Sequence, residues 1–152
     1  MNQSVMPDEL ILSDDGSSED IISAISGITK GFNFPVKYVR QENKGFRLAK
    51  TRNNGVRNSS GDFLIFLDQD LIHTTKLIET FIKNKKKNRF ITGMPIWLDK
   101  QTSVQLTEKK ISDSSFDEFI SLEEIDKIKK QFHKDKRYYF IHKLKLTNQP
   151  RL

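Results

Sequence analysis

The sequence predicts an α/β fold with a mostly parallel sheet flanked by helices. Short strand-like segments recur along the first two thirds of the chain: residues 9–12 and 63–67 are mainly apolar, and residues 36–40 alternate between apolar and charged side chains. The stretches between these segments carry apolar residues at helical spacing, which is the second observation. Strands that alternate with helices form βαβ units, and these units build parallel sheets.

The composition limits the class of protein. The chain has 152 residues, enough for one domain with a hydrophobic core. No apolar run approaches the roughly 20 residues that a membrane-spanning helix needs. The chain has no cysteine, which excludes disulfides, thiolate metal sites and a cysteine nucleophile. The first residues carry neither a basic start nor an apolar stretch of a signal peptide, so we expect a cytoplasmic location.

The net charge of +6 is unevenly distributed along the chain. Lysine and arginine are concentrated in residues 83–89 and 127–145. Basic clusters can attract nucleic acid, anionic lipid or a polyanionic substrate. Neither cluster carries an RNA-binding signature, so a solvated lysine-rich surface is favoured and no nucleic-acid partner is expected.

The first strand and helix are predicted from residues 9–29. The strand at 9–12 ends at the turn-forming segment 14–17 (DDGS), and Ser17 or Ser18 is predicted to cap the helix that follows. Isoleucines then recur at helical spacing, at positions 21, 22, 25 and 28.

The remaining elements of the first part follow in order. They are a strand at 36–40, a polar loop at 41–46, a helix at 48–58, a turn at 59–62, a strand at 63–67 that should be buried on both faces, a helix over 77–82 and a strand candidate at 90–96.

The second part of the chain changes in character. Residues 97–115 are polar and weakly periodic, which predicts a loop. Residues 115–134 contain two capping-box patterns and predict helix, and residues 138–141 predict a short strand or a partner surface. We therefore expect a ligand-binding core over 1–98 and an irregular and helical extension over 99–152.

Two aspartates follow the third predicted strand, Asp68 and Asp70. Carboxylates two residues apart at the end of a strand approach one point when the chain turns. Mg²⁺ and Mn²⁺ prefer such oxygen ligands and usually share them with substrate phosphates. A pair of solvated loop aspartates is the alternative. His73 follows closely and is either a further metal ligand or an ordinary loop histidine.

Two further segments carry chemistry. Residues 14–17 place Asp15 beside Gly16 after the first strand, where a carboxylate can accept a hydrogen bond from a nucleobase or ribose, or simply belong to a turn. Residues 45–55 (GFRLAKTRNNG) place Arg52 in a helix after a glycine loop. Arginine binds diphosphates bidentately, although a surface salt bridge is an equal alternative.

Together these segments resemble family 2 glycosyltransferases of the GT-A fold. Residues 12–20 (LSDDGSSED) resemble the family's VDDGSTD segment, and residues 49–55 (AKTRNNG) resemble its A.ARN.G segment. Residues 61–70 (GDFLIFLDQD) closely resemble its GDYLLFLDDD segment. The order and spacing of all three agree over residues 9–96, which makes the set far more specific than any single motif.

The resemblance implies a role for each matching residue. Asp15 would contact the base or ribose, Arg52 would lie near the diphosphate, Asp68 would face the sugar-nucleotide and share the metal, and Asp70 would hold Mn²⁺ or Mg²⁺. The adjoining loop supplies two weaker donor-binding candidates, Lys44 and Arg47.

The resemblance also implies a reaction. It is the transfer of a sugar from a nucleoside-diphosphate sugar to a hydroxyl of a glycan or glycolipid acceptor, usually with inversion, in bacterial surface polysaccharide or lipopolysaccharide synthesis. The basic clusters are compatible with peripheral contact at the anionic inner membrane face.

Two family segments have no match in this sequence. One is a first, central strand like VSVIIPTYN, and the other is a later segment like GFDE.F.GWGGED that carries acceptor contacts and the catalytic base. We therefore expect the chain to be a fragment, with the catalytic base beyond Leu152. We also expect this fragment to have an uncovered sheet edge and a tendency to self-associate. Whether this chain alone is active stays open. The alternatives are a non-catalytic nucleotide-sugar-binding or interaction module and, ranked lower, a basic nucleic-acid-binding domain.

Overall fold

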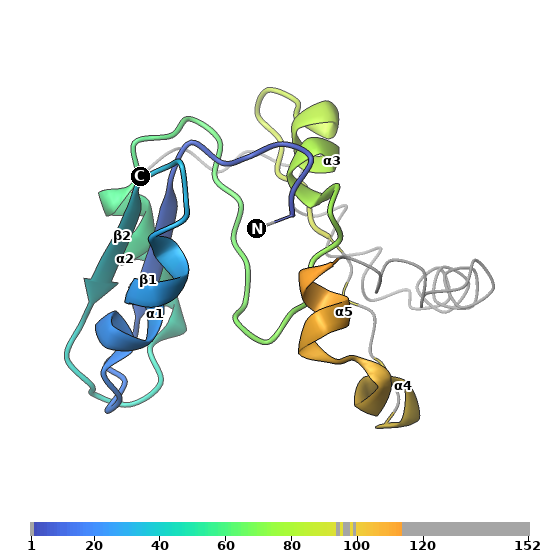
Figure 1. Ribbon diagram of the computed structural model, residues 1–152. Helices are drawn as coiled ribbons and strands as arrows, with labels where there is room; N and C mark the ends of the chain where they lie inside the picture. Colours follow the sequence, from blue (N-terminus) through green and yellow to red (C-terminus); the bar gives the residue numbers. More distant parts are fainter. Residues whose placement is uncertain (1, 94, 96–97, 99, 114–152) are drawn as a thin grey trace. The chain divides into compact units, whose positions relative to one another are not determined.

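The computed structural model describes residues 2–93, 95, 98 and 100–113 (Figure 1). The chain forms two compact units, Met1–Ile91 and Thr92–Leu152. The first contains β1, α1, β2, α2 and α3, and the second contains α4 and α5. The expected boundary at residue 98 stays a prediction.

Two parallel strands form the sheet in the described part of the chain. β1 (Leu10–Asp14) pairs with β2 (Val36–Arg40), in a register that sets Leu10 opposite Val36 and Asp14 opposite Arg40. Because the strands are parallel and in register, both end at the same edge of the sheet. The loops that follow them therefore meet there. The predicted α/β class with a parallel sheet is confirmed.

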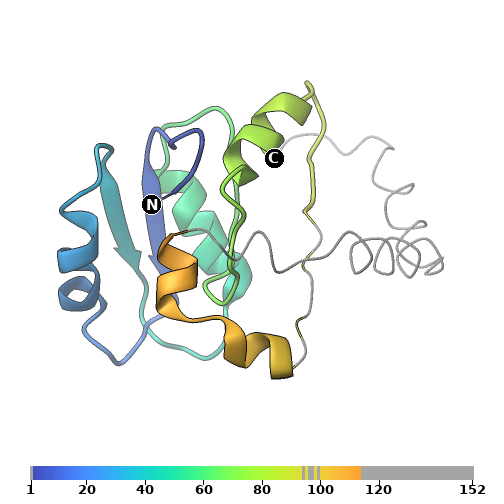
Figure 2. The same cartoon turned by 45° about the vertical axis from the view of Figure 1, so that its right-hand side comes forward.

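Helix α1 (Ile21–Thr29) begins at a different residue from the one predicted. Its N-cap is Asp20, whose carboxylate accepts hydrogen bonds from Ser23 N at 3.1 Å and Ser23 Oγ at 2.5 Å. The prediction of Ser17 or Ser18 as the cap was wrong, because the Ser17 hydroxyl donates to Asp14 instead. Helices α1 and α2 lie on opposite sides of the two strands (Figures 1 and 2).

Helix α2 (Leu48–Asn58) packs closely on β1 and has the predicted bounds. Ser13 Oγ of β1 donates a hydrogen bond of 2.7 Å to the carbonyl oxygen of Thr51, which is buried. Gly55 faces the same strand, and a Cβ at Gly55 would lie 3.7 Å from Ser13 Cβ. The small residues at this contact bring α2 close to the carboxyl end of β1.

The prediction of a strand at residues 63–67 was wrong. These residues are not assigned to any strand, and three of their side chains are exposed, Leu64 at 36%, Phe66 at 55% and Leu67 at 47%. A strand needs a neighbour that completes its backbone hydrogen bonds, and among the described residues β1 is paired with β2 alone. The described residues of the 90–96 strand candidate are not a strand either.

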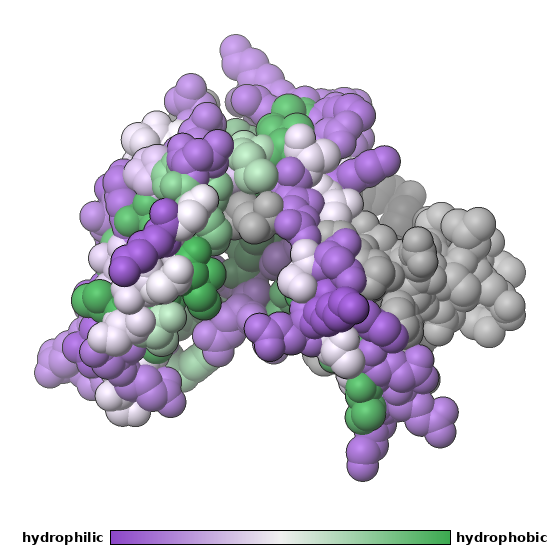
Figure 3. Space-filling view, viewed as in Figure 1, coloured by the Kyte–Doolittle hydropathy of each residue, from purple (hydrophilic) through white to green (hydrophobic). Residues whose placement is uncertain are grey.

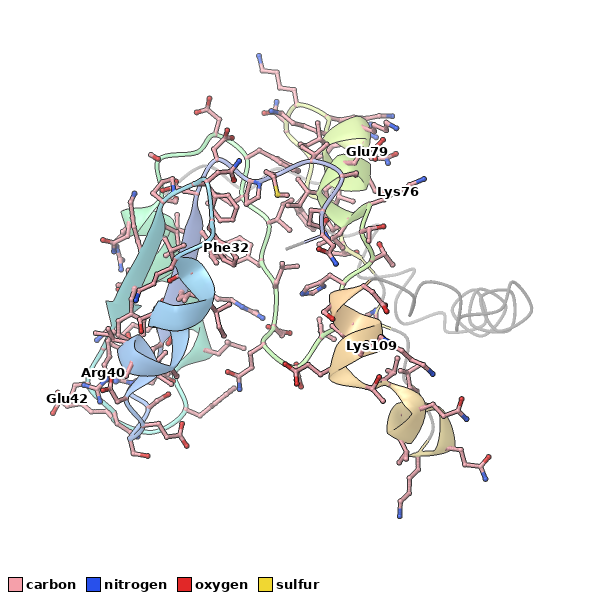
Figure 4. All side chains as sticks on the ribbon, viewed as in Figure 1. Phe32, Arg40, Glu42, Lys76, Glu79 and Lys109 are labelled. Atoms are coloured by element: carbon pink, nitrogen blue, oxygen red, sulfur yellow. The ribbon has the colours of Figure 1, made fainter. Side chains whose placement is uncertain are left out.

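Residues near the N-terminus form hydrogen bonds with the first turn of helix α3 (Leu77–Asn84). The first N–H groups of a helix have no partner within it. Gln3 Oε1 accepts one of them, from Ile78 N at 3.2 Å, and Ser4 Oγ donates to Glu79 Oε2 at 2.8 Å. Figure 4 labels Glu79 and Lys76, the N-cap residue, on this helix. The predicted helix over 77–82 is present and is longer than expected.

The second unit contains two short helices where a loop was predicted. They are α4 (Lys100–Gln105) and α5 (Glu108–Ser112), so the prediction for residues 97–115 was wrong. Thr107 caps α5, because its side chain accepts a hydrogen bond from Lys110 N at 3.3 Å. In the described part of the chain, no helix has the length and apolar character to cross a bilayer. The predictions for 115–134 and 138–141 lie outside the described residues.

Exposed apolar side chains on residues 63–67 should make the chain self-associate. Figure 3 shows hydrophobic side chains at the surface among hydrophilic ones, and Phe66 contributes with 55% exposure. We expect Phe66→Lys to lower the average molar mass measured by light scattering across a concentration series, because a charge opposes burial of this apolar surface between two copies of the chain. Ala24→Lys, which adds the same charge at an exposed residue of α1 without removing a large apolar side chain, is the control. A wild-type chain that stays monomeric at every concentration would contradict this prediction.

Candidate functional site

Two loops meet at the carboxyl edge of the sheet, residues 14–17 after β1 and residues 41–47 after β2. Gly16 is buried and has a φ of +95°. A Cβ at Gly16 would lie 2.5 Å from the backbone nitrogen of Asn43, so only glycine fits. Asn43 Nδ2 donates to the Gly16 carbonyl oxygen at 3.1 Å. The glycine therefore lets the loops close on one another.

Asp14 anchors the first loop. Its carboxylate accepts from Ser17 N at 3.0 Å, from Ser17 Oγ at 2.6 Å and from Tyr38 Oη at 2.7 Å, and Arg40 Nε lies 3.4 Å away. Burial raises the pKa of this carboxyl, but the hydrogen bonds from Ser17 and Tyr38 outweigh burial and hold the pKa below its usual value. Figure 4 labels Arg40 where β2 leads into the second loop. Asp14 is thus a structural residue.

Asp15 is held from the second loop. It accepts hydrogen bonds from Gln41 Nε2 and, at 2.5 Å, from the backbone N–H of Arg47. The bond from Gln41 is the main reason that the pKa of Asp15 lies below its usual value, and the Arg47 N–H adds to it. The side chain keeps 26% of its surface exposed. Asp15 is therefore an ionised carboxylate in a fixed orientation with lone pairs still available.

Gln41 joins the two loops to helix α2. It is only 8% exposed. Besides Asp15 it donates to Thr51 Oγ1 at 3.0 Å and accepts from Asn54 Nδ2 at 3.0 Å. Three of its four side-chain hydrogen-bonding positions are thus used inside the site. Sequence reasoning missed Gln41, and the available signal was a polar residue directly after a strand.

Arg52 and Asp68, two of the predicted donor-binding residues, lie together. Arg52 Nη2 of α2 is 2.9 Å from Asp68 Oδ1, and the side chains are 45% and 60% exposed. This ion pair attaches the end of the extended segment 63–67 to α2. Asp70 is exposed and follows within a turn. Arg52 on α2 and the carboxylates of Asp68 and Asp70 are therefore all exposed to solvent on the first unit.

The two weaker candidates are engaged within their own loop. Lys44 Nζ is 2.7 Å from Glu42 Oε2 in an exposed ion pair. Arg47 Nη2 donates to the Glu42 carbonyl oxygen, and Arg47 Nε is buried 3.7 Å from Asp15 Oδ1 without a hydrogen-bond partner. Figure 4 labels Glu42 in this loop. Arg47 therefore supports Asp15, and Lys44 lies at the surface.

The donor set of Asp68 and Asp70 fits a cation that is shared with a ligand. Among the described residues, no group of three or more histidine, cysteine, aspartate or glutamate side chains could hold a metal ion by itself. Mg²⁺, however, is usually held by one or two carboxylates together with substrate phosphates and water. Burial lowers the pKa of the neighbouring His73, which disfavours its charged form.

Glu9 holds the turn that leads to the Asp68 segment. Its Oε1 accepts from Ser60 N at 2.5 Å and Gly61 N at 3.1 Å, and its Oε2 lies 2.7 Å from Lys37 Nζ. The contact with Lys37 and the bonds from Ser60 lower the pKa of Glu9 to about 2. We call these contacts of Glu9 with Ser60, Gly61 and Lys37 the Glu9 latch. The latch holds the turn before residues 63–67 against both strands.

Acid should open this latch. A depressed folded-state pKa means that the stabilisation is present above the unfolded value of 4.5 and is lost as the pH falls toward about 2. We expect Glu9→Gln to flatten the dependence of unfolding free energy on pH between these values, measured by urea unfolding. Glu19→Gln, at an exposed glutamate, is the control. A wild-type-like pH dependence in Glu9→Gln would show that the latch is unimportant.

The first unit is a parallel α/β unit with the carboxylate of Asp15 fixed at the carboxyl edge of its two strands, which is the edge at which open α/β sheets bind their ligands. The family model for "Glycosyl transferase family 2" matches residues 1–146. The chain therefore belongs to the family 2 glycosyltransferases.

Several relatives are similar to the chain over about half of its length. It is 35% identical over 65 residues to a chondroitin synthase of Pasteurella multocida (strain Pm70), covering 43% of this chain and 6% of that protein. It is 33% identical over 76 residues to a hyaluronan synthase of Pasteurella multocida, covering 50% and 8%. It is 33% identical over 89 residues to the uncharacterized glycosyltransferase YfnE of Bacillus subtilis (strain 168), covering 57% and 22%. No solved structure matches the chain significantly.

Proposed function

We propose that this chain binds a nucleoside-diphosphate sugar together with Mn²⁺ or Mg²⁺, as the donor-binding part of a glycosyltransferase. The observation that carries the proposal is the joint presentation of Arg52, Asp68 and Asp70 on the unit in which Asp15 is fixed and ionised. Arg52, and a cation held by Asp68 and Asp70, would complement the anionic diphosphate of a sugar-nucleotide. The Asp15 carboxylate would accept hydrogen bonds from the donors of the base and ribose.

The Arg52–Asp68 ion pair suits a site that must exchange partners. Both side chains are exposed, and exposed ion pairs contribute only about 0–1 kcal/mol. A diphosphate could therefore replace Asp68 as the partner of the Arg52 guanidinium at little cost in free energy. Arginine would then bind the phosphate bidentately. Asp68 is then released toward the sugar and the cation. Asp70, with Asp68, would hold the cation, which supplies positive charge against the diphosphate as it leaves.

The proposed reaction is transfer of the sugar, with inversion, to a hydroxyl of a glycan or glycolipid acceptor. A general base must lie within hydrogen-bond reach of that hydroxyl, and we assign this role to no described residue. The relatives' names, chondroitin synthase and hyaluronan synthase, support a polysaccharide acceptor. Bacterial surface polysaccharide or lipopolysaccharide synthesis at the inner membrane face is the corresponding setting.

Calorimetric titration with UDP- and GDP-sugars tests the proposal. We expect binding that requires Mn²⁺ or Mg²⁺ and disappears in EDTA, followed by sugar release or transfer when acceptors are added. Metal-dependent binding without transfer to any acceptor would favour a non-catalytic module. No binding of any donor, with affinity for nucleic acid that falls steeply with salt, would contradict the proposal.

A further inference from the structure

Phe46 is the most exposed large hydrophobic side chain in the described part of the chain. Its exposed fraction is 90%, whereas Phe66 in the extended segment reaches 55%. A phenylalanine in water forgoes the favourable burial of a large apolar ring. The ring therefore makes little contact with the described part of the chain and is accessible to a ligand.

The backbone on both sides of Phe46 is fixed. Gly45 has a φ of +81°, and its N–H donates to Asn43 Oδ1 at 3.2 Å. Asn43 is itself bonded to the Gly16 carbonyl oxygen of the first loop. On the other side, the Arg47 N–H is bonded to Asp15. The exposed ring therefore extends from an anchored loop, one residue from the group that holds Asp15.

An exposed aromatic ring, on the residue next to one whose N–H binds a fixed carboxylate, matches the two kinds of surface that a nucleobase offers. A base offers a flat π surface that stacks on aromatic side chains, and polar edges whose N–H groups a carboxylate accepts. Asp15 keeps lone pairs for such an edge because its two bonded donors occupy only part of its capacity. The ring and the carboxylate belong to two loops that close on one another at the same sheet edge.

We propose that Phe46 stacks on the nucleobase of the donor and is the main determinant of affinity for the nucleoside part. This inference rests on the proposed function, because it assumes a nucleoside-diphosphate ligand. It assigns Phe46 to the nucleoside and the Arg52–Asp68–Asp70 group to the diphosphate. The two parts of the ligand should thus respond to different substitutions.

Calorimetric titrations of UDP, GDP and inorganic pyrophosphate, each with Mn²⁺, test the inference. We expect Phe46→Ala to weaken UDP and GDP binding roughly 5- to 150-fold, the range for loss of one aromatic stack, and to leave pyrophosphate binding unchanged. Phe46→Tyr should retain wild-type affinity for all three. Ile28→Ala, at a residue of α1 that is 69% exposed, is the matched control. Because Phe46 is so exposed, none of these variants should disturb the fold.

The outcomes separate the inference from the proposed function. If the wild type binds UDP with Mn²⁺ and Phe46→Ala binds it equally well, the stacking role is wrong and donor binding stands. The same holds if Phe46→Ala alters only the affinity for an acceptor glycan, or weakens pyrophosphate as much as UDP. If the wild type binds neither pyrophosphate nor any nucleoside diphosphate, the proposed function fails and the inference fails with it.

Discussion

Replacing Asp70 with asparagine should remove the metal-dependent part of donor binding. Asparagine keeps the size of the side chain and one oxygen, but it loses the negative charge that attracts a divalent cation. With only Asp68 left, the cation would be held by one carboxylate and the ligand phosphates. We expect Mn²⁺-dependent affinity for a UDP-sugar to fall about 100-fold, in keeping with the several kcal/mol that a bound cation contributes against phosphoryl charge.

Asp68→Asn should behave differently, because Asp68 also pairs with Arg52 at 2.9 Å. Its removal leaves the guanidinium without its carboxylate partner. Metal-free affinity for pyrophosphate should then rise above the wild-type value, while the gain produced by Mn²⁺ shrinks. Asp62→Asn, at an exposed aspartate before the same segment, is the control. If Mn²⁺ enhances donor binding equally in the wild type and Asp70→Asn, the metal assignment is wrong.

The fold was predictable where local patterns decide the structure. The strand at 36–40 and the helix at 48–58 agree with β2 and α2 because their apolar spacing and flanking turn residues act locally. Residues 63–67 have an equally strong strand composition but no ladder partner among the described residues. Strand formation depends on a neighbouring chain segment, and one apolar run contains no information about that neighbour.

The candidate site was also predictable from the sequence only where local patterns decide the structure. Motif spacing singled out Asp15, Arg52 and Asp68, but it could not show that Arg52 and Asp68 are paired, since this contact joins a helix to an extended segment. The sequence places Asp14 and Asp15 side by side after the first strand, with nothing to distinguish their roles. The structure separates them, because Asp14 binds its own loop through Ser17. An aspartate three residues before a serine is a local signal of that turn.

Gln41→Leu should have the largest effect on stability. The substitution places an apolar side chain of similar size in the buried position, but it leaves Asn54 Nδ2 without its acceptor and removes donors from Asp15 and Thr51. Leaving a fully buried polar group unpaired costs about 1–3 kcal/mol. Because Asp15 and Asn54 are only half-buried and keep partial access to water, the unfolding free energy should fall by about 2–3 kcal/mol in urea titrations. Donor affinity should fall as well, because Asp15 loses its fixed orientation. Gln69→Leu, at an exposed glutamine between the two motif aspartates, is the control for stability.

Gln41→Glu separates orientation from packing, because it keeps the shape of the side chain. At neutral pH the new carboxylate faces Asp15, and the repulsion raises its pKa in the folded state. A group whose folded-state pKa is raised stabilises the fold when it is protonated. The stability deficit of this variant should therefore be largest at neutral pH and should shrink as the pH falls through that raised pKa, where the protonated carboxyl can donate to Asp15. A deficit that is independent of pH would show that Gln41 acts through packing rather than by holding the Asp15 carboxylate.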